Sequence, residues 1–285
     1  MWDSEALRFL LQKALEEDLG IAGDITSLAA QASQRQAIGK CIAKDTGVIA
    51  GIAIAKEVYQ ILDKSVSFRE HLADGAPVEA GSVLFEVYGN AYTLLVAERL
   101  VLNLMQRLSG IATQARMYVQ ALAGTACRVL DTRKTTPLWR ALEKWAVQLG
   151  GGVNHRMGLY DQFLIKDNHI DLMGGIRPAI EAVLAYKEKQ GISAPIVVEV
   201  RNFPEIEQAL QYVGQIDRLL LDNFEPYQVA RAVRHIAGRI PVEVSGGITP
   251  ENVRAYAEAG ADFVSAGALT HSVRALDLHL KIRPV

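Results

Sequence analysis

The sequence predicts an α/β protein in which a small N-terminal domain precedes a parallel, barrel-like sheet. From residue 125 onward, short apolar runs alternate with helical stretches at intervals of about 20 to 35 residues, a rhythm typical of the βα units of a parallel sheet. Between residues 38 and 88, β-prone runs are instead broken by the turn signals DGAP and EAG, as in a separate α+β domain. The length of 285 residues suits a barrel, because α/β barrels reach this size as one unit.

The first part of the chain and its C-terminal tail are expected to form the smaller domain. Residues 4–19 place leucines on one face and stop at Gly20, which predicts an amphipathic helix. The runs 47-GVIAGI-52 and 82-SVLFEVY-88 predict strands. The tail 275-ALDLHLKI-282 alternates apolar and polar residues, so we expect a half-buried strand that returns to pair with this domain.

A long helix is predicted over residues 93–108, and its apolar residues occur on nearly every side. Such a helix is buried. Arg99, Asn103 and Gln106 nevertheless form one polar stripe on it. A buried charge needs a partner, so Arg99 either makes an internal salt bridge or faces another surface.

Six apolar runs predict the strands of the parallel sheet: 127-CRVLD-131, 162-QFLI-165, 196-IVVEV-200, 218-RLLLD-222, 241-PVEVS-245 and 262-DFVSA-266. Thr136-Pro137 and Thr249-Pro250 predict helix starts between them. Six or seven strands suggest a barrel close to the (β/α)8 type, with a doubly wound sheet as the alternative.

Composition restricts the class of function. A formal net charge of −2 argues against nucleic acid as a partner, because nucleic-acid binding needs a broad basic surface. Cys41 and Cys127 fit no metal or CxxC spacing, which indicates a reduced cytosolic protein. No signal peptide and no membrane-spanning run is evident in the sequence, so we expect a soluble cytoplasmic protein.

Polar residues gather where the predicted strands end. They are Asp131, Arg133, Lys134, Lys166, Glu199, Asp222 and the turns 245-SGG-247 and 266-AGA-268. In a barrel the carboxyl ends of the strands share one face, and active sites are built there. For single residues a structural explanation stays open, because Asp222 could cap the next helix and the glycines could serve only as tight turns.

The cations in this set indicate a small polyanionic substrate. They are Arg133, Lys134, His155, Arg156, Lys166 and His169, and arginine forks suit carboxylates and phosphates in particular. The segment SGGITPE places backbone N–H groups before a helix and predicts a phosphate site. Glu199 and Asp222 are then candidates to hold Mg²⁺ or to stabilise a developing cation.

Eight segments resemble the quinolinate phosphoribosyltransferases: GDITS, AERLVLNLMQRLSGIAT, DTRKTTP, GGGVNHRMGLYD, LIKDNH, LLLDNF, EVSGGI and GALTHS. The resemblance covers almost the whole chain. It implies a type II phosphoribosyltransferase fold, with an N-terminal α/β sandwich domain (1–110, joined by the tail 272–285) and an open, about seven-stranded, TIM-like α/β barrel (111–271). It also implies homodimers, or assemblies such as a hexamer of dimers, in which Arg99 reaches the partner's substrate.

The implied reaction joins quinolinate to phosphoribosyl pyrophosphate with Mg²⁺ and gives nicotinate mononucleotide, pyrophosphate and CO2. By resemblance, Arg133, His155, Arg156 and the partner's Arg99 hold the quinolinate carboxylates, while Lys134 and Lys166 face both substrates as catalytic residues. Glu199 and Asp222, also as catalytic residues, would bind Mg²⁺ or ribose and stabilise an oxocarbenium-like transition state. The remaining substrate-binding residues, most of them around the 5′-phosphate, are Thr132, Ser245, Gly246, Gly247, Gly267 and His271.

The chain departs from the family pattern at four positions. Leu138 and Trp139 stand where many members carry Gly and Leu, and Val197 and Arg201 replace two glutamates that flank Glu199. These changes leave the details of Mg²⁺ coordination open.

Three other functions are weighed against this one. The first is a related branch associated with molybdenum transport operons, and the second is a barrel lyase with Lys166 as a Schiff base. The third is a non-catalytic ligand-binding protein. The cations around the site favour quinolinate, and the pair Glu199 and Asp222 favours an enzyme. The role of His169 is open between orienting its loop and touching substrate.

Overall fold

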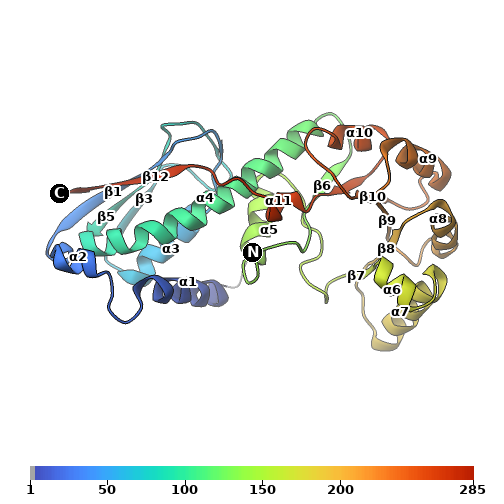
Figure 1. The fold of residues 1–285 in the computed structure, drawn as a ribbon, viewed down its shortest axis with the longest axis horizontal. Coiled ribbons are helices and arrows are strands. Elements are labelled where there is room, and N and C mark those ends of the chain that lie inside the picture. The colour runs from blue at the N-terminus through green and yellow to red at the C-terminus, as the bar shows by residue number, and fades with distance from the viewer. Residues whose placement is uncertain (1–3) are drawn as a thin grey trace. The chain divides into compact units, whose positions relative to one another are not determined.

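The computed structural model describes residues 4–285, which divide into two compact units (Figure 1). The first unit contains the chain up to Arg116 together with 141–151 and 273–285, and the second contains 117–140 and 152–272. Helix α4 (Ala91–Ala121) extends the predicted helix at both ends and runs through the boundary expected at residue 110. The segment 141–151 packs with the first unit, although it lies within the sequence range expected for the barrel.

The first unit is built on a four-stranded antiparallel sheet in the order β12-β1-β5-β3. Its strands are β1 (Gln36–Ala43), β3 (Ser67–Glu70), β5 (Val83–Asn90) and β12 (Leu278–Pro284). The tail strand β12 pairs with β1 from Ala37 opposite Pro284 to Ala43 opposite Leu278. The predicted return of the tail to this domain is therefore confirmed.

Helices and a short ribbon complete the first unit: α1 (Ser4–Leu19), α2 (Ile25–Ala29), η1 (Ala32–Gln34), α3 (Ile52–Leu62), most of α5 (Arg140–Leu149), β2 (Gly47–Val48) and β4 (Pro77–Val78). Helix α1 confirms its prediction. The strand predicted over 47–52 is wrong beyond Val48, because the Asp74 carboxylate starts α3 there. It accepts backbone N–H groups from Gly51 at 2.6 Å, Ile52 at 2.9 Å and Ala53 at 3.1 Å, as a capping residue does.

The second unit holds a parallel sheet in the order β6-β11-β10-β9-β8-β7. Its strands are β6 (Arg128–Leu130), β7 (Phe163–Ile165), β8 (Ile196–Val200), β9 (Arg218–Asp222), β10 (Val242–Ser245) and β11 (Phe263–Ser265). All six predicted strands are confirmed. Val153 adds a parallel bridge to Leu130 on the outer side of β6, and no pairing joins Val153 to β7 within residues 4–285. The sheet is thus an open, TIM-like barrel.

The helices of the second unit are α6 (Asp167–Leu172), α7 (Ile176–Gln190), α8 (Phe203–Ala209), η2 (Leu210–Tyr212), α9 (Pro226–Ile236), α10 (Val253–Glu258) and α11 (Ala268–His271). Both predicted helix starts are wrong by three residues: α5 begins at Arg140 and α10 at Val253. Leu138 has a φ of +67°, which no right-handed helix admits. Before α10, Asn252 Oδ1 accepts the N–H of Thr249 at 2.8 Å and holds a turn.

The polar stripe of α4 splits into two environments. Gln106 Nε2 donates to the carbonyl of Leu278 at 3.0 Å, so this residue serves the packing of the first unit. Arg99 and Asn103 are exposed, and no carboxylate within residues 4–285 forms an ion pair with Arg99. The internal salt bridge considered for Arg99 is therefore absent from the described part of the chain. No helix in that same range is both long enough and apolar enough to cross a membrane.

Candidate active site

A cavity of about 780 Å³ opens at the carboxyl ends of the parallel strands in the second unit. The residues that the resemblance assigns to the site line it, with the exception of Arg99: Thr132, Arg133, Lys134, His155, Arg156, Lys166, Glu199, Asp222, Ser245, Gly246, Gly247, Gly267 and His271. The candidates Asp131 and His169 do not line it. Strand ends and the loops after them supply the lining residues, as expected for this fold. Arg99 lies on α4 in the first unit.

One side of the cavity is formed by two arginines. Arg133 Nε is buried and has no hydrogen-bond partner within residues 4–285. Burial lowers the pKa of Arg156, and the charge of Arg133 lowers it further, while Asp161 acts in the opposite direction. Two neighbouring guanidinium groups, one with an unpaired buried N–H, favour an anion that neutralises both.

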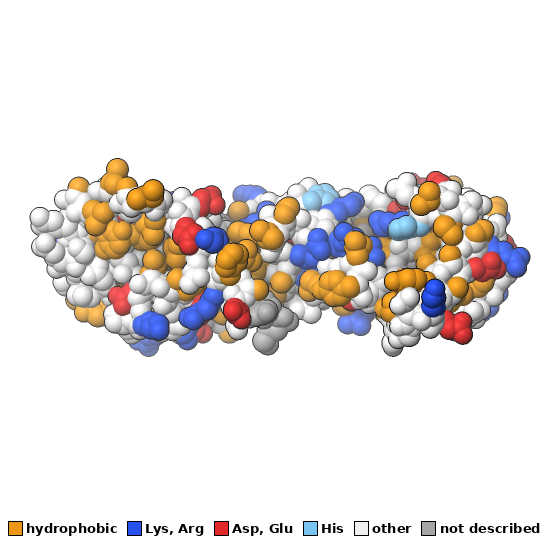
Figure 2. Space-filling view, turned by 90° about the horizontal axis from the view of Figure 1, so that it is seen from below, with side chains coloured by type: hydrophobic (Ala, Val, Ile, Leu, Met, Phe, Trp, Pro, Cys, Tyr) orange, Lys and Arg blue, Asp and Glu red, His pale blue; other side chains and the backbone are white. Residues whose placement is uncertain are grey.

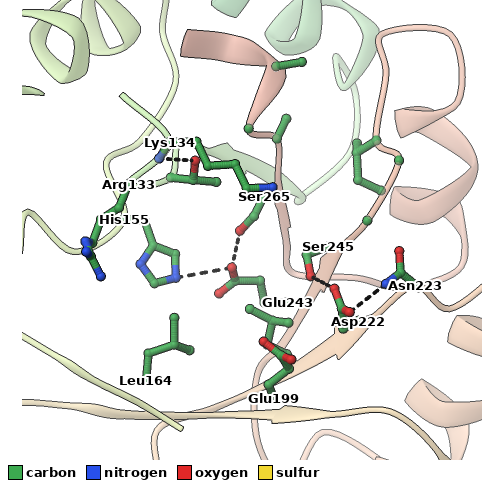
Figure 3. A pocket seen from close by; sticks show the side chains of 18 of the residues that line it. Arg133, Lys134, His155, Leu164, Glu199, Asp222, Asn223, Glu243, Ser245 and Ser265 are labelled. Carbon is green, nitrogen blue, oxygen red and sulfur yellow. Dashed lines mark hydrogen bonds and ion pairs between the residues drawn. The ribbon is translucent and has the colours of Figure 1, made fainter. Parts of the chain in front are cut away.

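His155 stands beside these arginines and is held within the protein through its backbone and its ring. Its backbone N–H donates to Asp131 Oδ1 at 2.8 Å, and Asp131 is fully buried at the end of β6. The ring Nδ1 accepts the backbone N–H of Arg156 at 2.8 Å. The ring Nε2 lies 3.3 Å from Glu243 Oε1, and Figure 3 shows the ring pointing at that carboxylate.

Glu199 and Asp222 lie on the other side of the cavity (Figure 3). Burial raises the pKa of Glu199; the N–H of Asp167 lowers it and the charge of Asp222 raises it again. Asp222 is fixed by two donors, Ser245 Oγ and Asn223 Nδ2, each at 2.7 Å. Two oriented carboxylates that feel each other's charge are suited to a cation.

The turn after β10 has the geometry of a phosphate loop. Gly246 has a φ of +97°, and a Cβ there would lie 2.1 Å from Asn223 Oδ1, so only glycine fits. Gly247 also has a positive φ, with open space where its side chain would be. The buried Tyr118 donates its hydroxyl to the carbonyl of Ile248, the residue after Gly247, at 2.9 Å. The exposed backbone of this turn can approach an anion closely.

Three exposed residues add polar groups to the cavity: Lys134, Lys166 and His271. Lys134 and Lys166 are exposed, and a Cβ on Gly267 would lie 2.9 Å from the Lys134 side chain, so that glycine gives the lysine room. Because Lys166 is exposed, it lacks the desolvation that a Schiff-base lysine needs. His169 accepts the backbone N–H of Lys166 on its ring Nδ1 at 3.0 Å, a contact that supports the loop-orienting role considered for it.

The departures from the family pattern lie outside the cavity lining. Val197 is buried in β8. Arg201 pairs with Asp171 at 2.9 Å and with Glu205 at 2.7 Å. Leu138 adopts its left-handed conformation with the side chain 79% exposed. The carboxylates Glu199 and Asp222 therefore stand without the flanking glutamates.

Sequence reasoning missed Glu243, which also lines the cavity. It is fully buried in β10, where Arg218 Nη1 lies 2.8 Å from its Oε2 and Ser265 donates to its Oε1. A carboxylate inside the apolar run 241-PVEVS-245 was the available signal, and the same reasoning that singled out Glu199 applies to it.

The face shown in the space-filling view supports an anionic ligand. Lys, Arg and His side chains gather in one region of this face with few Asp or Glu beside them, whereas the signs are mixed elsewhere (Figure 2). Fold and site together define an open α/β barrel enzyme whose cavity, lined by several cationic side chains, lies at the carboxyl ends of its strands.

Comparison with known proteins identifies the family. The profile of the quinolinate phosphoribosyl transferase C-terminal domain matches residues 111–281, and that of the N-terminal domain matches residues 24–109. The chain belongs to this family.

Named relatives and a solved structure agree. The chain is 40% identical to a mitochondrial "quinolinate phosphoribosyltransferase [decarboxylating] 2a" of Nicotiana tabacum, over 97% of this chain and 82% of the relative. It is 41% identical to a "probable nicotinate-nucleotide pyrophosphorylase [carboxylating]" of Bacillus subtilis, over 97% and 93%. The crystal structure of NadC from Streptococcus pyogenes superposes with a TM-score of 0.93 at 35% identity, covering 100% of this chain and 99% of that one.

Proposed function

We propose that this protein transfers the phosphoribosyl group of phosphoribosyl pyrophosphate to quinolinate with loss of CO2, giving nicotinate mononucleotide and pyrophosphate for NAD biosynthesis. The observation that carries the proposal is the arginine pair, in which Arg133 Nε is buried without a partner beside Arg156. A dicarboxylate supplies charge for both arginines. Family membership and the names of the relatives support the same substrates.

Quinolinate lies on the arginine side of the cavity in this proposal. Arg133 and Arg156 hold its two carboxylates, and Lys134 adds a further cation. Arg99 of a second subunit completes the set, because its exposed position on α4 leaves it available to another surface. The protein is accordingly a homodimer with shared active sites, alone or within a larger assembly of dimers.

The phosphoribosyl donor lies over the glycine turns. Ser245, Gly246, Gly247 and Gly267 surround its 5′-phosphate, with Thr132 and His271 beside them, and Lys166 faces its pyrophosphate. Positively charged side chains and open backbone N–H groups are suited to these anions.

Glu199 and Asp222 are the residues that would hold Mg²⁺ when the donor is bound. No cluster of three or more metal-binding side chains occurs within residues 4–285. Mg²⁺ commonly uses one or two carboxylates plus substrate phosphates, and the pair Glu199 and Asp222 could supply those carboxylates. The bound ion would offset the charge of the departing pyrophosphate.

With both substrates held in these positions, the reaction proceeds in two steps, phosphoribosyl transfer and then decarboxylation. The pyridine nitrogen forms a bond to ribose C1 as the bond from C1 to pyrophosphate breaks. The positive charge on the ring favours loss of the adjacent carboxylate as CO2, and a proton takes its place. Fixed cations and carboxylates stabilise these charge changes without an enzyme nucleophile.

The test is incubation of the protein with quinolinate, phosphoribosyl pyrophosphate and Mg²⁺, followed by chromatography for nicotinate mononucleotide. We expect product with the wild type and a loss of at least about a hundredfold in kcat/KM with Arg133→Met. Absence of product from quinolinate, with nicotinate accepted instead, would overturn the proposal. The compartment stays a prediction, since the plant relatives carry mitochondrial or chloroplastic names.

A further inference from the structure

Glu243 is a fully buried carboxylate that the proposed chemistry does not use. It lines the cavity from β10, and Figure 3 shows its carboxylate turned toward the His155 ring. Three side chains face it: His155 with Nε2 at 3.3 Å, Arg218 with Nη1 at 2.8 Å, and Ser265 through a hydrogen bond. A buried carboxylate with this many partners is held in one position.

The hydrogen bonds of His155 determine which ring nitrogen carries the proton. Nδ1 accepts the backbone N–H of Arg156, so it carries no hydrogen. The proton of the neutral ring therefore lies on Nε2, the atom that faces Glu243. Both nitrogens are engaged within the protein, and the side chain is only 7% exposed.

Arg218 makes a neutral ring compatible with a carboxylate neighbour. Its guanidinium pairs with Glu243 and stacks on the ring of Phe263 at 4.2 Å. The negative charge of Glu243 is thus balanced without protonation of His155. Burial opposes ionisation of Glu243, but its contacts with His155, Ser265 and Arg218 outweigh burial and hold its pKa below the usual range.

We infer that Glu243 is a positioning residue for the dicarboxylate site and that His155 acts as a neutral connector between it and Arg156. Glu243 fixes the ring through Nε2–H, and the ring fixes the backbone of Arg156 through Nδ1. The side chain of Arg156 lines the cavity from this fixed backbone, and its Nη1 also donates to the carbonyl of Gln162 at 3.2 Å. This differs from the expectation that His155 holds a substrate carboxylate as a cation. The effect on catalysis rests on the proposed function.

The first test is made on the wild-type protein and needs no substrate. The chain has six histidines, so ¹⁵N-histidine labelling with long-range ¹H–¹⁵N correlation at pH 7 resolves each ring, and His155→Gln identifies the signal of His155. We expect a neutral ring protonated on Nε2. An imidazolium, or a ring protonated on Nδ1, overturns the inference.

The second test separates positioning from general stability. Glu243→Gln keeps the shape of the side chain and removes its charge. We expect KM for quinolinate to rise by about tenfold, with kcat within about threefold and KM for phosphoribosyl pyrophosphate unchanged.

The matched control for Glu243→Gln is Glu143→Gln. Glu143 is also fully buried and paired with an arginine, Arg107 at 2.6 Å, but it lies in the first unit. We expect this variant to lose stability without a selective change in KM for quinolinate. A folded Glu243→Gln variant with wild-type KM, or with the same changes as Glu143→Gln, overturns the inference.

The two tests also separate this inference from the proposed function. If Glu243→Gln does not fold, the ring measurement on the wild type decides. Failure of the wild type to form nicotinate mononucleotide contradicts the proposed function and leaves the ring measurement valid.

Discussion

Asp131 at the end of β6 holds the backbone of His155, 24 residues further along the chain, through a hydrogen bond of 2.8 Å. This bond fixes the start of the segment that carries His155 and Arg156. Since Asp131 is fully buried, its carboxylate acts on this segment from within the fold and does not reach a ligand itself.

Loss of the Asp131 carboxylate should therefore weaken both the fold and the site. We expect Asp131→Ala to lower the free energy of unfolding by about 1–3 kcal/mol, because buried donors lose their acceptor, and to raise KM for quinolinate. Urea denaturation and steady-state kinetics measure the two effects. Asp131→Asn keeps one acceptor oxygen and should lose less; equal losses in both variants contradict the proposed role of this bond.

Gly246→Ala tests the phosphate turn. The new Cβ would meet Asn223 Oδ1, and the φ of +97° disfavours any L-residue. We expect a loss of stability of at least about 1–2 kcal/mol and a raised KM for phosphoribosyl pyrophosphate.

The control for this substitution is Gly81→Ala, where φ is +95° but the space is open and the residue lies in the first unit. It should show the backbone strain without the change in KM. If both alanine variants leave KM unaltered, the turn does not bind the donor.

Chemical labelling of the cysteines tests the packing of both units. Burial raises the pKa of Cys41 to about 12 and that of Cys127 to about 11, and only the thiolate reacts. We expect neither thiol to react with iodoacetamide at pH 8 in the native protein, and both to react in urea. The folded state raises the pKa of both thiols and so favours their protonated form. The free energy of unfolding is therefore unaffected by these thiols below the thiol pKa of the unfolded chain, and it falls as the pH rises above that pKa. Labelling of native Cys41 would show that the first unit opens at this site.

Mixed dimers test the contribution of Arg99. Arg99→Ala and Lys134→Ala should each be inactive alone, because one removes the shared arginine and the other a residue of the cavity. After subunit exchange, hybrid dimers contain one intact site, so we expect partial recovery of activity in the assay for nicotinate mononucleotide. Subunits that demonstrably exchange without recovery would contradict the shared site.

Much of the barrel and its cavity could be predicted because the signals are local. Each strand of the second unit is a short apolar run with a polar residue at its end or directly after it, and strand direction alone brings those ends to one face. The start of α3 could not be predicted in this way, since it depends on Asp74, which is distant in the sequence. The late start of α5 depends on the left-handed backbone of Leu138, a residue type that rarely adopts it.

The ring state of His155 was likewise beyond the sequence. It depends on Glu243, 88 residues away in the chain, and on the charge that Arg218 supplies to that carboxylate. In the sequence, a histidine among arginines is interpreted as one more cation, because the hydrogen-bond partners of its two ring nitrogens are known only from the structure.

The measurement that tests the central claim most directly is the stoichiometry of a single assay with quinolinate labelled in the carboxylate next to the ring nitrogen. The proposed function predicts one labelled CO2 and one nicotinate mononucleotide for each pyrophosphate released, with Mg²⁺ required. Release of pyrophosphate without labelled CO2, or equal use of nicotinate in place of quinolinate, would contradict it.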